Sequence, residues 1–174
     1  RSDSQLGTAG LMSAIRHGHV TMVNALGVGV LETQALMAFL PAISRALTGG
    51  DLKLPNVATW WCGGAKQLAH VQRHASRMMI GPAQGTRMPH EGSAPHAIGG
   101  TLFHSEDSQV STWLAANAPS LMAKELVTLS TTPVFENGAL VPRPMTLRVF
   151  LARGPNGWDV MPGGFARVGA GQDA

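Results

Sequence analysis

Hydrophobic and polar residues alternate over short stretches in the last third of the chain. In residues 147–151, the period of two typical of a strand places Arg148 and Phe150 on one face and three aliphatic residues on the other. Turn signals flank this run at Asn137-Gly138 and at residues 154–157. The pattern therefore predicts an antiparallel β-meander over residues 119–168.

The first two thirds of the chain show a different pattern, in which apolar positions recur at intervals of three and four. This spacing predicts a helix from about Leu31 to Leu47, which Pro41 either kinks or restarts, because proline lacks the N–H donor that a helix interior needs. Further helices are expected over residues 11–16, 65–74 and 106–116, and β-type runs over residues 19–23 and 78–80. The predicted fold class is α+β, an antiparallel sheet packed with helices.

The two patterns suggest a helix-rich lobe over residues 1–118, joined to the meander in one compact unit. A chain of 174 residues is long enough to bury one such core. Within the first lobe, residues 81–100 are rich in glycine, proline and histidine and show no periodicity. We therefore expect a long mobile loop there.

Composition narrows the class of protein. Charged residues make up only 13% of the chain and hydrophobic residues 44%, which suits a domain that packs on other parts of a longer protein. The net charge is +3, but the basic residues are dispersed, so we expect no nucleic-acid partner. No apolar run reaches the roughly 18 residues of a membrane span. The lone Cys62 fits a reducing compartment, so we predict a cytoplasmic protein without membrane contact.

Three arginines of the meander are candidate anion ligands, because the planar guanidinium group matches the geometry of phosphate oxygens. Arg148 is the first candidate, since it is alone among apolar neighbours in its run. Arg143 is held between two prolines, and Arg167 follows Gly163-Gly164, where glycine permits a ligand to approach closely. The alternative for Arg148 is a strand arginine on a solvated face, and the pattern does not separate the two interpretations.

Asn24 and Glu32 carry oxygen atoms of the kind that Mg²⁺ prefers. Their positions, on a turn and at a helix start, permit them to converge on one ion. A structural turn asparagine and a glutamate stabilised by the helix dipole explain them as well. His70 and His74 share the i,i+4 spacing of zinc pairs, yet no third ligand is evident, and a polar helix face is the simpler interpretation.

Five blocks of the chain are distinctive. They are RSDSQLG at residues 1–7, GHVTMVNALGVGVLETQALMAFLPAISRAL at residues 18–47, LPNVATWWCG at residues 54–63, PRPMTLRVF at residues 142–150 and VMPGGFARV at residues 160–168. In this order they resemble the circularly permuted ATP-grasp family, and the resemblance covers most of the chain. A complete ATP-grasp ligase is longer, and the sequence opens inside a family block without an initiator methionine. We therefore expect a portion of a longer protein.

The resemblance implies ATP-dependent ligation of a carboxylate to an amine or a thiol through an acyl-phosphate. ATP and Mg²⁺ would be the cofactors, a small molecule or peptide the other substrate, and the rest of the parent protein a partner. The resemblance places the adenine-binding hinge at residues 123–127, where Lys124 and Glu125 would lie beside the nucleotide. It also implies that Arg148 makes the catalytic contact with phosphate. The alternative for the hinge is an exposed strand whose charges alternate toward solvent.

One string departs from the family pattern. Many ATP-grasp strands place a lysine or arginine in an I-(K/R)-P-A-like string to bind nucleotide phosphates, whereas this chain has Gly81 at that position. Arg77 or Arg87 could substitute from nearby, or the phosphates could rely on other arginines. A second hypothesis follows, a non-catalytic scaffold or partner-binding domain that keeps the ATP-grasp-like fold with a degenerate phosphate site.

Overall fold

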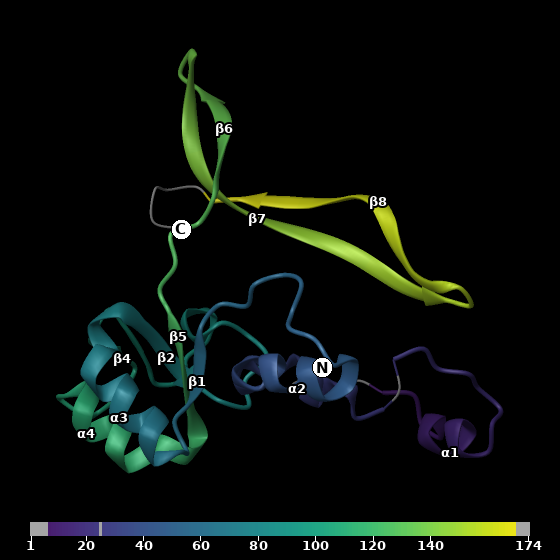
Figure 1. Ribbon diagram of the computed structural model, residues 1–174, viewed down its shortest axis with the longest axis horizontal. Helices are drawn as coiled ribbons and strands as arrows, with labels where there is room; N and C mark the ends of the chain where they lie inside the picture. The colour runs from purple at the N-terminus through teal and green to yellow at the C-terminus, as the bar shows by residue number, and fades with distance from the viewer. Residues whose placement is uncertain (1–6, 25, 170–174) are drawn as a thin grey trace. The chain divides into compact units, whose positions relative to one another are not determined.

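The computed structural model describes residues 7–24 and 26–169, and the chain divides after Leu126 into two compact units (Figure 1). Each unit contains an antiparallel sheet, and helices accompany the sheet of the first unit, which confirms the α+β class. The boundary lies later than residue 118, where the sequence pattern placed it. The reason is that strand β5, Leu121–Glu125, pairs within the sheet of the first unit.

The first unit is built on a five-stranded sheet in which each neighbouring pair is antiparallel. Its strand order is β1-β5-β2-β3-β4, with bounds Thr59–Trp61, Leu121–Glu125, Met78–Pro82, His96–Ile98 and Thr101–Phe103. The β-type run expected at residues 78–80 is therefore a strand. β5 lies between β1 and β2, although both precede it by a long stretch of chain.

Residues 81–100, expected as a loop, contain regular structure. They hold the end of β2, a 3₁₀ turn at Pro89–Glu91 (η4) and strand β3. A strand of three residues is too short to display a period of two, which explains why its pattern was not visible in the sequence.

The remaining helical elements precede or flank these strands. They are α1 Leu11–Arg16, η1 Val28–Glu32, η2 Gln34–Ala38, α2 Leu40–Thr48, α3 Ala65–His74, η3 Ala75–Arg77, α4 Val110–Asn117 and η5 Ala118–Ser120. α1 and α3 match the predicted ranges, whereas α4 begins at Val110, later than the expected residue 106. The helix expected from Leu31 is instead divided into η1, η2 and α2, and Pro41 lies in the first turn of α2, where its missing N–H costs nothing. Residues 19–23 form no strand in the described chain. No helix among the residues described here is long and apolar enough to cross a membrane.

One face of the first sheet packs against α3 and α4. Val71 of α3 and Leu114 of α4 are completely buried, together with Ile80 and Ala123 from the two central strands. Each aliphatic side chain of this size removed from water contributes on the order of 1.5–3 kcal/mol. This small core fixes the positions of β2 and β5.

The opposite face of the same sheet carries Lys124 and Gly81. The register aligns Lys124 with Met79, and Gly81 with Met122, so these residues share one face and the core residues Ile80 and Ala123 share the other. η2 and η4 contact this second face, because Gln34 of η2 binds Lys124 and Pro89 of η4 lies against Gly81. Little space is left beside the Cα atom of Gly81.

The second unit is a three-stranded sheet of order β6-β7-β8, with bounds Thr131–Glu136, Ala139–Gly154 and Gly157–Val168. Figure 1 shows that the long strand β7 pairs with β6 over its first part and with β8 over the remainder. Asn137 and Gly138 both have positive φ, as the Asn-Gly hairpin signal predicts. The meander is therefore confirmed over these three strands, without the residues that form β5.

Candidate functional site

One face of the ribbon formed by strands β7 and β8 carries two arginines. Arg148 lies opposite Phe165, and Thr146 lies opposite Arg167. Residues directly opposite each other in an antiparallel pair project to the same side, and their diagonal neighbours are roughly 7–8 Å apart. Arg148 and Arg167 are therefore diagonal neighbours on one face, as an anion-binding pair requires.

A hollow of about 710 Å³ lies along this part of the ribbon, lined by residues 146–149 and 165–167. Arg148 and Arg167 are both exposed, and neither has an acidic partner within the described part of the chain. Two adjacent guanidinium groups without counterions repel each other. Their arrangement favours an anion that carries more than one negative charge.

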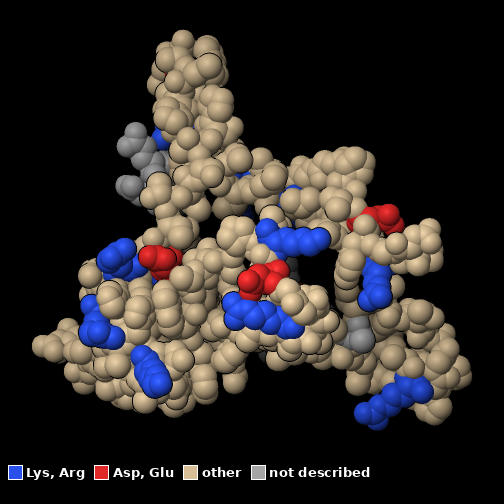
Figure 2. Space-filling model, viewed as in Figure 1, with Lys and Arg blue, Asp and Glu red and all other residues tan. Residues whose placement is uncertain are grey.

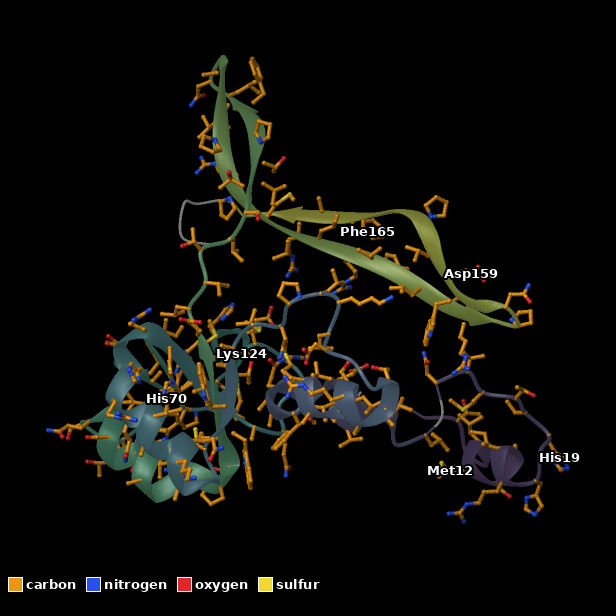
Figure 3. The ribbon with its side chains drawn as sticks, viewed as in Figure 1. Met12, His19, His70, Lys124, Asp159 and Phe165 are labelled. Carbon is orange, nitrogen blue, oxygen red and sulfur yellow. The ribbon has the colours of Figure 1, made fainter. Side chains whose placement is uncertain are left out.

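Two aromatic rings accompany the arginines. Phe150 follows Arg148 on the same face of β7, and its ring meets that of Phe165 edge to face, with centroids 6.0 Å apart and an interplanar angle of 82°. Figure 3 labels Phe165 on β8. Both rings are partly exposed, so they offer an apolar surface on which a planar group can stack.

The glycine pair of the VMPGG segment shapes this face. Val149 pairs with Gly164 and Leu151 with Val160, so β8 carries extra residues there and bulges. Gly163 lies in the bulge with φ 129°, and a Cβ atom on Gly164 would lie 2.5 Å from the carbonyl oxygen of Arg148. Glycine is therefore required for β8 to approach Arg148 this closely.

Arg143 does not join the other two arginines. Alternation along β7 puts it on the face opposite Arg148, and its Nε atom donates a hydrogen bond to Oε1 of Glu136 at 2.9 Å. This bond lowers the pKa of Glu136 and raises the pKa of Arg143. The guanidinium group is thus already paired in the hairpin of β6 and β7.

The two hinge residues differ in environment. Lys124, which Figure 3 labels on β5, is 7% exposed, and its Nζ atom donates a hydrogen bond to Oε1 of Gln34. Burial lowers the pKa of Lys124. Glu125, the next residue of β5, projects to the other side of the strand and lies 3.7 Å from Nη2 of Arg77 in a largely exposed ion pair. The alternative interpretation of the hinge, an exposed strand whose charges point toward solvent, therefore fits Glu125 but does not fit the buried Lys124.

Other cationic side chains are scattered. On the face shown in Figure 2, Lys and Arg side chains of the first unit stand apart from one another, as their dispersal along the sequence leads us to expect. Arg45 forms an exposed ion pair with Asp51 at 2.6 Å. These charges form no counterpart to the pair on the ribbon.

The proposed magnesium ligands are both accessible. Asn24 has φ 63°, and Glu32 ends η1 with an exposed side chain. Among the residues that the structure describes, no group of three His, Cys, Asp or Glu side chains is placed to hold a metal ion. His70 stacks on Trp60 with ring centroids 4.7 Å apart, and its ring lies 4.4 Å from that of His74, so this pair packs along α3.

Sequence reasoning missed three residues around these sites, Thr146, Phe165 and Gln34. Thr146 and Phe165 join Arg148 only through the register of β7 and β8, and Gln34 reaches Lys124 across a large sequence separation. The glycine pair before Phe165 was a usable signal, because it marks a place where two backbones come close.

The family model described as circularly permuted ATP-grasp type 2 matches residues 1–169. The chain is 29% identical over 168 residues to an uncharacterized protein of Mycobacterium tuberculosis, covering 97% of this chain and 18% of the relative. A second uncharacterized protein of that organism is 30% identical over 168 residues, covering 97% of this chain and 30% of the relative. A protein of Frankia casuarinae named "Putative glutamate--cysteine ligase 2-2" is 31% identical over 169 residues, which is 94% of this chain and 19% of the relative. The chain thus spans less than a third of the length of these curated relatives.

Proposed function

Because the chain belongs to the circularly permuted ATP-grasp type 2 family, we propose that it is the nucleotide-binding portion of an ATP-dependent ligase that joins a carboxylate to an amine or a thiol. The observation that carries the proposal is the pair Arg148 and Arg167, diagonal on one ribbon face and without an acidic partner among the described residues. The name of the Frankia casuarinae relative, a ligase of two amino acids, supports this class of reaction.

The reaction of such a ligase runs through an acyl-phosphate. A carboxylate oxygen attacks the γ-phosphorus of ATP and ADP leaves; the amine or thiol then attacks the acyl carbon, and inorganic phosphate leaves. Negative charge on the phosphate oxygens must be held in place during the first step. We assign that role to Arg148, with Arg167 as its neighbour, and we propose that the rings of Phe150 and Phe165 contact the planar part of the ligand.

ATP enters such reactions with Mg²⁺, an ion that keeps several waters and takes only one or two carboxylates from the protein. Asn24 and Glu32 are the ligands that we propose, and their oxygen atoms fit the preference of this ion. Lys124 and Glu125 remain our proposed hinge residues, while the ion pair of Arg143 with Glu136 makes Arg143 a weaker candidate.

Calorimetric titration of the 174-residue chain with Mg·ATP tests the proposal. We expect saturable heat, and Arg148→Ala should weaken binding by about 10- to 100-fold, since a hydrogen bond to a charged group contributes roughly 1.5–3 kcal/mol. Arg153→Ala is the matched control, because Arg153 is an exposed arginine of the same strand on the opposite face, where it pairs with Trp158.

The outcomes separate the proposal from its alternatives. Equal losses in the Arg148→Ala and Arg153→Ala variants would show a general charge effect and remove the ribbon site. Absence of heat with the wild-type chain would favour the partner-binding scaffold that Gly81 suggests. Salt-sensitive binding of an oligonucleotide in place of ATP would indicate a nucleic-acid module.

A further inference from the structure

Strand β1 is an open edge of the first sheet. It lies at one end of the order β1-β5-β2-β3-β4, so only one side of its backbone is paired with another strand. The N–H group of Glu125 donates to the carbonyl oxygen of Ala58 at 2.9 Å, and that of Cys62 donates to Leu121 at 3.0 Å. In an antiparallel pair, residues bonded in this way alternate with residues whose N–H and C=O groups point away from the partner strand. The N–H and C=O groups of Thr59 therefore point toward the open edge.

These two main-chain groups have no hydrogen-bond partner among the residues that the structure describes. The hydroxyl group of Thr59 donates to the carbonyl oxygen of Val57 at 2.8 Å, so the side chain is engaged while the main-chain groups are not. A free N–H group beside a free C=O group matches the C=O and N–H groups of one residue of an extended peptide. The two residues would then form the pair of bonds found in an antiparallel ladder.

A hollow of about 430 Å³ lies beside this edge. Its larger apolar lining residues come from η2, α2, the chain after α2 and the chain around β1, and they are Met37, Pro41, Leu52, Val57 and Trp60. The Nδ2 atom of Asn56 donates to the carbonyl oxygen of Met37 at 2.7 Å, which ties the segment before β1 to η2. The hollow thus offers an apolar wall next to the free main-chain groups of Thr59.

We propose that β1 binds an extended segment of another polypeptide as an additional strand, with an aliphatic side chain of that segment in the hollow. The main chain of Thr59 supplies hydrogen bonds, and the apolar wall supplies the preference for an aliphatic side chain. The wall formed by η2, α2 and Leu52 stands beside β1, so the space suits a single strand better than the edge of a second sheet (Figure 1). The inference goes beyond the proposed function, because it requires neither a nucleotide nor a phosphate group.

The probe is a fluorescently labelled peptide of sequence KTVLVTK with an amidated carboxyl end, titrated with the 174-residue chain. We expect saturable binding, which weakens when aspartate replaces the leucine of the peptide. Methylation of single backbone nitrogens of the peptide tests strand addition directly, because alternate N–H groups of an added strand face β1. Methylation of the nitrogen that faces Thr59 should weaken binding about tenfold, and methylation of either adjacent nitrogen should not.

Two variants at position 59 separate the main chain from the side chain. Thr59→Pro removes the outward N–H group, a change that an edge strand tolerates, and should weaken peptide binding about tenfold. Thr59→Val loses the hydroxyl group but keeps the N–H group, so it should bind the peptide as the wild-type chain does. Melting temperatures show whether each variant folds, and if Thr59→Pro does not, the methylated peptides decide the question with the wild-type chain.

Several results would overturn the inference. These are absence of peptide binding at millimolar concentration, equal affinity of all the methylated peptides, and equal binding by a folded Thr59→Pro and by Thr59→Val. Sedimentation without peptide tests the other occupant, since a wild-type dimer that Thr59→Pro dissociates would assign the edge to a second copy of the chain. The peptide carries no phosphate, so these outcomes are independent of the nucleotide proposal.

Discussion

Gly81→Ala adds one methyl group at a crowded point of the second sheet face. Gly81 and Pro89 are both buried, and the added Cβ atom would lie 2.6 Å from Cβ and 2.7 Å from Cγ of Pro89. Carbon atoms in contact normally stay about 3.5–4.0 Å apart. Either β2 or η4 must therefore move by about 1 Å to admit the added methyl group.

The expected change in the free energy of unfolding follows from two opposing effects. Overpacking of a fitted interior costs about 1–3 kcal/mol. Replacement of glycine by alanine also restricts the unfolded chain, which returns about 0.4–1 kcal/mol where the backbone conformation suits alanine. No positive φ is recorded at Gly81, so this gain applies. We expect a net loss of about 1–2 kcal/mol in the free energy of unfolding of the first unit.

Urea denaturation followed by tryptophan fluorescence measures this loss. In a Trp158→Phe background the remaining tryptophans, Trp60, Trp61 and Trp113, all report on the first unit. Gly29→Ala is the matched control, because a Cβ atom there meets nothing within 4 Å, and its effect should stay within about 0.5 kcal/mol.

A double variant identifies the cause. Pro89→Gly removes the side-chain atoms that the added methyl group would strike, so Gly81→Ala should cost almost nothing when it is added to Pro89→Gly. Wild-type stability of the Gly81→Ala variant, or the same loss with and without Pro89→Gly, would refute the steric reason for the missing side chain at position 81.

Three other predictions concern the core, the hairpin and the cysteine. Leu114→Ala should lower the free energy of unfolding by about 2–5 kcal/mol, whereas Leu147→Ala, on a side chain that is 63% exposed, should cost less than about 1 kcal/mol in urea titrations. The hydrogen bond from Arg143 lowers the pKa of Glu136, so its stabilisation is present above the pKa of an unfolded glutamate and is lost as the pH falls through the lowered value. An NMR titration of the Glu136 carboxyl carbon should give a pKa below 4.5 that rises in Arg143→Met; an unchanged value would contradict the pairing. Burial raises the pKa of Cys62 to about 11, so Ellman's reagent at pH 8 should react with it only after unfolding, and rapid reaction of the native chain would oppose this burial.

Local signals in the sequence predicted those parts of the fold that depend on neighbouring residues. The apolar spacing of residues 65–74 predicted α3, and the Asn137-Gly138 signal predicted the turn between β6 and β7. The period of two over residues 147–151 also placed Arg148 and Phe150 on one face. In each case the residues that determine the structure lie close together in the sequence.

The features that were missed depend on contacts between residues that are not neighbours in the sequence. β5 belongs to the first unit because it pairs with β1 and β2, a choice that no pattern within residues 121–125 reveals. The burial of Lys124 depends likewise on η2, and the pairing of Arg143 with Glu136 depends on how far an arginine reaches along a hairpin. The restart of the helix at Pro41 was one of the two expected outcomes, but the division of the preceding residues into η1 and η2 was not expected.

The most direct test of the proposed nucleotide site is an NMR titration of the arginine Nε–Hε signals of the ¹⁵N-labelled chain with Mg·ATP. The signals of Arg148 and Arg167 should shift together and saturate at one ligand concentration, while those of Arg143, paired with Glu136, and Arg153, on the opposite face, should stay in place. Movement of Arg143 or Arg153 without Arg148 and Arg167, or no movement at all at millimolar Mg·ATP, would contradict a phosphate site on this face of the ribbon.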